Sequence, residues 1–569
     1  MIHRLLSWIG SLCLALTVHA QLTFRNPVIN ADAPDMSICK VADTYYMIST
    51  TMHLMPGGPV MKSRDMVHWE MAGYVFDRID DGDRYNLLGG TVYGQGQWAS
   101  SIRYHMGRFW VWFTANGAPG KGFVFSAEHA EGPWRLEARP PHMHDASLFF
   151  DEDGKRYLFT GSGSCTVVEL DEQFNPKPGG LNKKVVDAAE DPQEKGALLE
   201  GSSVFKHNGY YYICMISMKW NTPGRFRREV CYRSRQIEGP YEKKILIETP
   251  FETFGGAGQG CLVGDDQSDQ NWWALLFQDR EGIGRVPSAM PVTWVEGWPM
   301  CGEYTGVVNT QVADIPEDNP TGNPLLDRRR YRVPSDQTQR HPSVKGFIGS
   351  DEFDLPAEDR ERQDTYHGRM GLKLYWQWNH NPIDEAWSLT ERPGFLRLKT
   401  ARVVNNLNVA PNTITQRMSA PACTGSVALD IRGMKDGDIC GLAAFNGDSG
   451  VLRVVRKGQR AVLQLTEEKA VFAADHSVER VDVEVLQEVS LKKAGTVYLK
   501  VHGDFEGGRD MASFSYSLDG TQWIPVGREV KMRFDYQRHF MGTKFAIFNY
   551  ATKQLGGQVD IDWFHFEEN

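Results

Sequence analysis

Residues 204–217 read "VFKHNGYYYICMIS": an apolar strand, a polar turn containing Gly209, and a second strand that opens on aromatic residues. Glycine in a short polar turn between two apolar runs is typical of a tight β-hairpin. The same layout recurs along the chain at starts that are roughly 45 to 65 residues apart. The four further copies are "ICKVADTYYMIST" (38–50), "IRYHMGRFWVWFT" (102–114), "LFFDEDGKRYLFTG" (148–161) and "CLVGDDQSDQNWWALLFQ" (261–278).

More strand-like segments lie between these hairpins, such as "PVMKSRDMVHWEMAG" (59–73) and "EVCYRSRQIEGPYE" (229–242). Each repeat therefore holds four strands, and the spacing is near the ~40–50 residues of a propeller blade. Five such units predict a five-bladed β-propeller over residues 21–302. The alternative is a β-sandwich whose hairpins resemble one another by chance.

A second domain follows the repeats. Residues 303–350 form a charged, proline-rich linker. From 351 to 569 the chain alternates apolar and polar residues in short segments such as "GTVYLKVHG" (495–503), which predicts a β-sandwich. The predicted fold class is all-β, a five-bladed propeller followed by a jelly-roll sandwich.

Composition excludes some classes of function. With 569 residues, 41% of them hydrophobic, the chain can bury large cores and form two domains. The net charge is -10 and no basic run occurs, so we expect no nucleic-acid partner. The 16 Trp and 20 Tyr residues provide surfaces on which flat ligands such as sugars can stack. Nothing in the sequence indicates the oligomeric state.

Residues 1–20 have the pattern of a secretory signal peptide. Arg4 supplies a positive charge, residues 5–18 are apolar, and Val18-His19-Ala20 fits a small-x-small cleavage site. The alternative is a membrane anchor, but the apolar run is shorter than the ~20 residues of a spanning helix, and no later segment is apolar enough. We therefore expect export to the periplasm or the cell exterior. Eight scattered cysteines follow, which we expect to be mostly buried, free thiols.

Acidic residues precede the first strand in three of the five repeats. In chain order, the residues just before these strands are Asp35, Trp98, Asp145, Glu200 and Gln259. The innermost strands of a propeller line its central channel, so these side chains should meet in one axial pocket. Convergent carboxylates raise one another's pKa, which allows a protonated acid beside an ionised base near neutral pH. Asp32 lies outside this register, as a turn residue or a support behind the pocket.

The motifs around these acids resemble those of the family 43 glycoside hydrolases, exported enzymes that act on pentose-containing plant polysaccharides. The motifs, within residues 26–302, are "PDMSI" (34–38), "HDASLFFDEDG" (144–154) and "LLEGSSVF" (198–205). The resemblance implies that Asp35 is the general base and Glu200 the general acid, and that Asp145 tunes the pKa of the acid and orients it. Met36 and Ser202 replace two prolines of the family pattern, which changes backbone but leaves the carboxylates in place.

The same resemblance assigns substrate-binding residues. Trp98 would wall the sugar subsite, and Arg285 would hydrogen-bond a sugar hydroxyl. Gln259, in "GAGQG" (256–260), stands where many members have a histidine that helps hold a calcium ion or a water on the axis. An amide oxygen is a neutral ligand, so a structural calcium on the axis stays open as an alternative. No metal ligands are assigned, and no cofactor is required.

The second domain resembles the lectin-like jelly-roll module that follows the propeller in many family 43 enzymes. Its segment "WQWNHNP" (376–382) combines aromatic and polar side chains. These residues are either core and turn, or the edge of the catalytic pocket or a separate glycan contact.

These features predict an exo-acting, inverting glycosidase that releases a terminal pentose from plant polysaccharides or oligosaccharides. The resemblance favours α-L-arabinofuranose, with β-D-xylose as the alternative. Asp35 would deprotonate a water on one face of the sugar while Glu200 protonates the leaving oxygen, with the carboxyl groups roughly 6.5–9.5 Å apart. The rival from another class is a non-catalytic glycan-binding propeller, which would accept any hydrogen-bonding residue at position 200, whereas catalysis requires an acid there.

Overall fold

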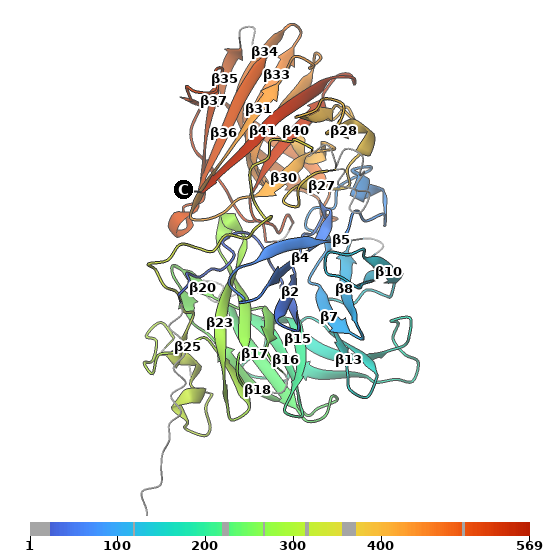
Figure 1. Ribbon diagram of the computed structural model, residues 1–569, viewed down its shortest axis with the longest axis vertical. Helices are drawn as coiled ribbons and strands as arrows, with labels where there is room; N and C mark the ends of the chain where they lie inside the picture. Colours follow the sequence, from blue (N-terminus) through green and yellow to red (C-terminus); the bar gives the residue numbers. More distant parts are fainter. Residues whose placement is uncertain are drawn as a thin grey trace, which may run out of the picture.

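The computed structural model shows two β-rich bodies stacked along the long axis of the molecule (Figure 1). It describes residues 23–568 except 118–119, 219–226, 266–267, 313–317, 356–370, 492–494 and 537, so the expected signal peptide lies outside the described residues. Within this range no helix is long and apolar enough to cross a membrane. Helical structure there is limited to the 3-10 segments η1 (Asp83–Asn86), η2 (Glu281–Ile283), η3 (Pro324–Leu326), η4 (Arg328–Arg330), η6 (Asp384–Ala386), η7 (Leu407–Val409) and η8 (Glu506–Gly508).

The lower body is a propeller of five antiparallel blades. Its innermost strands contact one another in a closed ring, in the order β1, β7, β11, β15, β21 and back to β1. The predicted five-bladed propeller is therefore confirmed. The first blade contains β1 (Ser37–Val41), β2 (Thr44–Ile48), β4 (Gly57–Ser63) and β5 (Glu70–Phe76), and the second contains β7 (Ser101–His105), β8 (Arg108–Asn116), β9 (Gly122–Ala127) and β10 (Arg135–Ala138), with β6 (Gly96–Gln97) added to β8. The third blade contains β11 (Ser147–Phe150), β12 (Arg156–Thr160), β13 (Ser164–Leu170) and β14 (Asn182–Asp187). The fourth contains β15 (Leu198–His207), β16 (Tyr210–Met218), β17 (Arg227–Ser234) and β18 (Glu242–Ile247), and the fifth contains β21 (Gly260–Val263), β22 (Trp273–Asp279), β23 (Arg285–Val295) and β24 (Trp298–Cys301).

The fourth blade shows why the hairpins form. His207 pairs with Tyr210, so the loop between β15 and β16 is only Asn208-Gly209, with φ of 48° and 75°. A two-residue loop with positive φ at both positions matches the right-handed twist of the strands and favours asparagine and glycine. Beyond the turn, alternate residues of each strand enter the core between blades. There the rings of Phe205 and Tyr212 stack with their centroids 5.0 Å apart.

The upper body is a sandwich of two large antiparallel sheets, as predicted. A continuous apolar core fills the space between the sheets. The first sheet contains β3 (Leu54–Met55), β27 (Gln377–Asn379), β30 (Ile414–Arg417), β40 (Lys544–Ala551), β32 (Asp438–Phe445), β33 (Asp448–Lys457), β34 (Arg460–Phe472) and β35 (Val478–Leu491). The second contains β28 (Trp387–Ser388), β29 (Leu396–Lys399), β41 (Gln558–Glu568), β31 (Ala422–Asp430), β36 (Thr496–Asp504), β37 (Met511–Ser517), β38 (Ile524–Pro525) and β39 (Val530–Lys531).

The described parts of the predicted linker pack on the propeller. The short strands β25 (Glu303–Tyr304) and β26 (Tyr331–Arg332) pair with each other, and β19 (Pro250–Phe251) and β20 (Phe254–Gly256) form another small sheet nearby. Leu326, Tyr331 and Val333 belong to the same apolar cluster as residues of the fourth and fifth blades. All eight cysteines outside the predicted signal are buried and free, which confirms the thiol prediction.

The two domains share a sheet. Strand β3 comes from the propeller sequence, yet it pairs with β27 of the sandwich, with Met55 opposite Trp378 and Leu54 opposite Asn379. The aromatic–polar segment that contains β27 is buried: Trp376 and Trp378 are core residues, and His380 is fully buried at the domain boundary. The alternative of an exposed glycan contact at this segment is therefore wrong.

A chain that ends at Gly302 is expected to be poorly soluble and weakly active. Its β3 would lose the strand it pairs with, and buried apolar side chains such as Met55 and Leu54 would face water. Light scattering and kcat/KM of the truncated and full-length proteins test this expectation. A monomeric, fully active propeller fragment would show that the domains are independent.

Three histidines lie buried where the domains meet. The ring centroid of His53, which precedes β3, is 4.9 Å from that of His380 and 5.6 Å from that of His539. The Nδ1 atoms of all three have no hydrogen-bond partner among the described residues. Burial lowers the pKa of each imidazole, to about 3 for His380 and about 4 for His539. Neighbouring histidine or lysine side chains add to the effect, whereas Asp535 and Asp32 oppose it at His539. All three imidazoles are therefore neutral at pH 7.

Acidification should destabilise the fold through this cluster. An unfolded histidine binds a proton below its ordinary pKa of about 6.5, whereas folded His539 binds one only near pH 4. Stability that is fully present above about pH 6.5 is therefore lost as the pH falls towards the folded pKa. The wild-type protein should lose about 3 kcal/mol of its free energy of unfolding through His539 between pH 7 and pH 4, and the variant His539→Phe should not show this part of the loss.

Denaturant unfolding at the two pH values measures this effect. His129→Phe is the control, because His129 is exposed in the propeller and should leave the pH dependence unchanged. An unaltered pH dependence in His539→Phe would contradict the prediction.

Candidate active site

The chain turns towards the propeller axis at the entrance to the innermost strands. Asp35, Asp145 and Gln259 stand at this point with φ of 55°, 44° and 68°, and Gly201, with φ of 65°, takes the same position in the fourth blade. Left-handed backbone is uncommon for residues that carry a side chain, and it persists where the surrounding structure holds it in place. All four residues line one small cavity on the axis, so the structure brings Asp35, Asp145 and Gln259 together.

Glu200 lies one residue before this position in the repeat. It belongs to β15, whose register with β16 shifts between Glu200 and Ser203. The bulge places its carboxylate at the same end of the channel, with Oε2 3.1 Å from Nε2 of His144. The expectation that all three acids share one repeat position is therefore wrong for Glu200, although its carboxylate still joins the cluster. Trp98 is placed in the same way as Glu200, because it comes one residue before Ala99, which lines the cavity in the second blade.

His144 lies between two of the carboxylates. Its Nε2 is 3.1 Å from Glu200 Oε2 and 3.7 Å from Asp145 Oδ2. Burial alone would lower the pKa of His144, but Asp145, Glu200 and Asp35 outweigh burial and raise it to about 9. The imidazole is therefore positively charged at neutral pH. His144 is not among the predicted site residues; its place beside Asp145 in the "HDAS" motif is the signal that could have identified it.

Asp145 is a carboxyl group with a strongly altered proton affinity. Burial raises its pKa to about 7; Glu200 and Asp35 act in the same direction, while His144 and Arg285 oppose them. The Asp145 side chain is enclosed, and its Oδ1 has no hydrogen-bond partner among the described residues. Strongly interacting groups titrate together, so a proton near neutral pH belongs to the cluster and not to one oxygen. The cluster can therefore hold a transferable proton beside ionised carboxylates.

Arg285 holds Asp35 in place. Its Nη1 donates to Oδ1 and Oδ2 of Asp35, at 3.0 and 3.2 Å, and both side chains are buried. Charge-assisted hydrogen bonds of this kind fix the orientation of a carboxylate. Asp32 supports the arrangement from behind: its Oδ1 accepts the backbone N–H of Arg285, and its Oδ2 accepts that of Gly542, each at 3.0 Å. Asp32 is thus a support residue that links the site to the sandwich.

The sandwich contributes Phe540 to the site. The ring of Phe540 stacks on that of Trp98 with centroids 5.9 Å apart, and the Arg285 guanidinium lies 4.3 Å from the same ring. Trp98 is held by a hydrogen bond from Nε1 to the carbonyl of Gly94, at 2.9 Å, and its ring centroid is 5.7 Å from that of His144. Trp98, which the resemblance predicts to wall the sugar subsite, therefore stacks on an aromatic ring from the other domain.

The axial cavity beneath the carboxylates has a volume of about 20 Å³, which is enough for one water-sized species. Calcium takes six to eight oxygen ligands. Here the hydroxyls of Ser37 and Ser101 accept backbone N–H groups from the next blade, and those of Ser37 and Ser147 accept hydrogen bonds from Arg103. The Gln259 side chain packs against Gly201. These neutral, engaged hydroxyls beside a guanidinium are poor calcium ligands, and Asp35 and Asp145 are the only negatively charged residues among those described that line the cavity.

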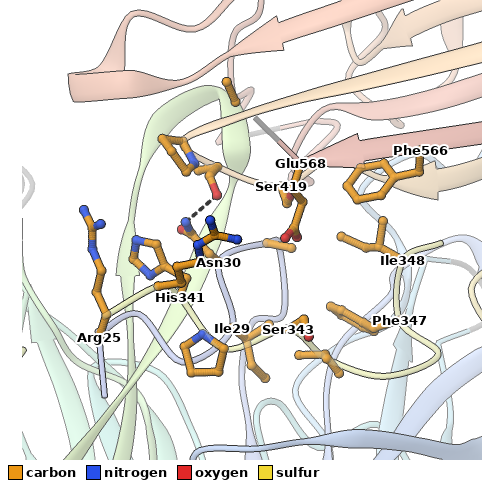
Figure 2. Close-up of a pocket in the computed structure, with 17 residues that line it drawn as sticks. Arg25, Ile29, Asn30, His341, Ser343, Phe347, Ile348, Ser419, Phe566 and Glu568 are labelled. Atoms are coloured by element: carbon orange, nitrogen blue, oxygen red, sulfur yellow. Dashed lines mark hydrogen bonds between the residues drawn. The ribbon is translucent and has the colours of Figure 1, made fainter. Parts of the chain in front are cut away.

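A larger cavity, of about 620 Å³, lies elsewhere between the domains. Figure 2 shows Arg25 and His341 on one side of it and Phe347, Ile348 and Phe566 on the other. None of the three carboxylates lines it. It is therefore separate from the candidate active site.

Comparison with known proteins agrees with this geometry. Residues 24–299 match the model of the glycosyl hydrolases family 43, and residues 363–567 match the beta xylosidase C-terminal concanavalin A-like domain. A beta-xylosidase of Formosa agariphila is 28% identical over 599 residues, covering 96% of this chain and 90% of the relative. The non-reducing end alpha-L-arabinofuranosidase BoGH43B of Bacteroides ovatus is 30% identical over 481 residues, covering 81% of each.

A solved structure has the same architecture. The bifunctional GH43-CE protein of Bacteroides eggerthii superposes with a TM-score of 0.82 at 35% identity. The match covers 97% of this chain and 64% of that one, so the solved protein extends well beyond the matched region. Matches to both domain models, with relatives aligned across both domains, decide the assignment: the chain belongs to glycosyl hydrolase family 43 and is a glycoside hydrolase of the xylosidase and arabinofuranosidase type.

Proposed function

We propose that the protein is an exo-acting, inverting glycosidase that releases a single terminal pentose from xylan-type or arabinose-bearing saccharides. The observation that carries this proposal is the cluster of Asp35, Asp145 and Glu200 at one end of the propeller channel, with His144 between two of them. Family 43 enzymes need no cofactor, so these side chains must supply the chemistry.

Each side chain has a distinct role in this proposal. Asp35, held by Arg285, takes a proton from the attacking water. Glu200 gives a proton to the leaving oxygen, and its hydrogen bond with His144 holds the carboxyl in place. Asp145 raises the proton affinity of the cluster, because like charges at short range disfavour full ionisation. Direct attack by water inverts the anomeric carbon.

For the pentose itself we place β-D-xylose first and α-L-arabinofuranose second, which reverses the order expected from sequence. Relatives named beta-xylosidase, from Formosa agariphila and, as a putative enzyme, from Xylanibacter ruminicola, align over 96% and 90% of this chain. The arabinofuranosidase of Bacteroides ovatus supports the alternative.

A panel of 4-nitrophenyl glycosides tests this proposal. The β-D-xyloside should give the highest kcat/KM, the α-L-arabinofuranoside should follow, and hexosides should be poor substrates. Xylo-oligosaccharides should shorten by one residue at a time from the non-reducing end. Release of longer fragments would contradict exo action. Binding without hydrolysis of any pentoside would favour the glycan-binding alternative.

We also propose that the protein is exported, on the basis of the pattern in residues 1–20. N-terminal sequencing of protein recovered outside the cytoplasm should find Gln21 as the first residue. An intact Met1 on that protein would contradict cleavage after Ala20.

A further inference from the structure

Arg103 extends from β7 of the second blade into the propeller channel. Its Nη1 donates to Ser37 Oγ at 3.2 Å, and its Nη2 donates to Ser147 Oγ at 2.7 Å and to the carbonyl of Val204 at 3.3 Å. These acceptors belong to the innermost strands of the first, third and fourth blades. One guanidinium therefore joins four of the five innermost strands.

The acceptors stand close to the catalytic carboxylates in the chain. Ser37 and Ser147 come two residues after Asp35 and Asp145, a distance of roughly 7 Å along a strand. Both serines also line the axial cavity that the two acids share. A shift of any of these strands would thus move a carboxylate relative to its partners.

No carboxylate forms an ion pair with Arg103 among the described residues. The neighbouring ionisable groups are the thiols of Cys39 and Cys261, and burial raises the pKa of Cys39 to about 12, so this thiol stays neutral. A guanidinium keeps its charge in proteins. Arg103 is half-buried. A cation in this setting without a counter-ion among the described residues is costly, and its contacts with three other blades call for a functional reason.

We propose that Arg103 is the built-in cation of the propeller axis: a positioning residue that sets the spacing of the catalytic carboxylates and takes the place of an axial metal ion. The three hydrogen bonds tie these strands together around a positive charge, as coordination of their oxygens by a bound metal ion would otherwise do. The serine hydroxyls of the axial cavity, neutral and already hydrogen-bonded, agree with this assignment, and the negative charge there comes from the carboxylates of Asp35 and Asp145 that Arg103 is proposed to position. The inference rests on the proposed roles of Asp35, Asp145 and Glu200.

The test compares the full-length variants Arg103→Met and Arg103→Lys with the wild-type enzyme. The substrate is the 4-nitrophenyl pentoside that the wild-type enzyme hydrolyses best. Arg103→Met should lower kcat by about 10²-fold with little change in KM, because misplaced catalytic groups cost rate more than binding. The acidic limb of its kcat–pH profile should move to higher pH, because a positive charge near the carboxylates is lost. Arg103→Lys should recover part of kcat, because the ammonium restores the charge and one or more hydrogen bonds.

Arg328→Met is the control, because Arg328 is a buried arginine of the linker that packs on the propeller, and it pairs with Glu248 and Asp318 away from the axis. It should lower the unfolding temperature without moving the pH profile. Wild-type enzyme treated with EDTA should keep full activity, and added calcium should not raise it.

Loss of wild-type activity in EDTA with recovery in calcium would overturn the proposal, as would a wild-type kcat in Arg103→Met. If Arg103→Met does not fold, the kcat of Arg103→Lys and the activity of the wild-type enzyme in EDTA still test the proposal. Failure of these tests is distinct from failure of the proposed function, since the roles of Asp35 and Glu200 are tested by their own variants.

Discussion

Replacing Asp35 with alanine is expected to lower kcat/KM by about 10²–10⁴-fold on every glycoside that the enzyme hydrolyses. The base activates water, and every substrate needs that water whatever its leaving group. The loss should therefore be equally severe for a dinitrophenyl pentoside and for an oligosaccharide. Initial rates on both substrates measure it.

A matched variant separates the loss of the base from strain in the backbone. Asp35 has a left-handed φ of 55°, which alanine tolerates poorly and asparagine tolerates well. Asp35→Asn also keeps an oxygen for the hydrogen bond from Arg285, but its amide cannot accept a proton at neutral pH. Equal losses in the two variants would assign the effect to the base, whereas near-normal rates in Asp35→Asn would contradict this role.

Replacing Glu200 with alanine is expected to have an effect that depends on the leaving group. The acid protonates the leaving oxygen, which a sugar alcohol needs and a dinitrophenolate hardly needs. Hydrolysis of oligosaccharides should therefore fall by about 10²–10⁴-fold, while the activated substrate should lose far less. Added azide should restore part of the activity on the activated substrate by attacking in place of water.

Glu200→Gln is the matched control for this experiment. It keeps the length of the side chain and an oxygen for the contact with His144, which is 3.1 Å from Glu200 in the native protein. Both variants should show the same dependence on leaving group. Equal losses on all substrates would remove Glu200 from the role of acid.

The fold could be predicted because its repeats are local. A short polar turn between two apolar strands marks each hairpin, as at Gly209. The pairing register of its two strands is set by residues that are close in sequence. Placing Asp35 and Asp145 on the axis then needed only the equivalence of the repeats. Their left-handed backbone at the strand entrance is the same in both blades.

The remaining features depend on contacts that no repeat encodes. Phe540 reaches Trp98 from the other domain, and β3 joins a sheet whose other strands lie hundreds of residues later. The offset of Glu200 arises from a bulge in β15, and its sign in the sequence is one extra residue between Glu200 and the repeat start at Val204. Arg103 lies in an ordinary strand pattern, and its importance comes from contacts with three other blades that this pattern does not show.

The stereochemistry of the first product tests the central claim most directly. In the proposed mechanism Asp35 activates a water that attacks the sugar while Glu200 protonates the leaving group, so no covalent intermediate forms. Proton NMR of a β-D-xyloside during early turnover should show α-D-xylose as the first anomer, before mutarotation. β-D-xylose as the first product would mean net retention, contradict a water-activating role for Asp35, and make one of the carboxylates a nucleophile.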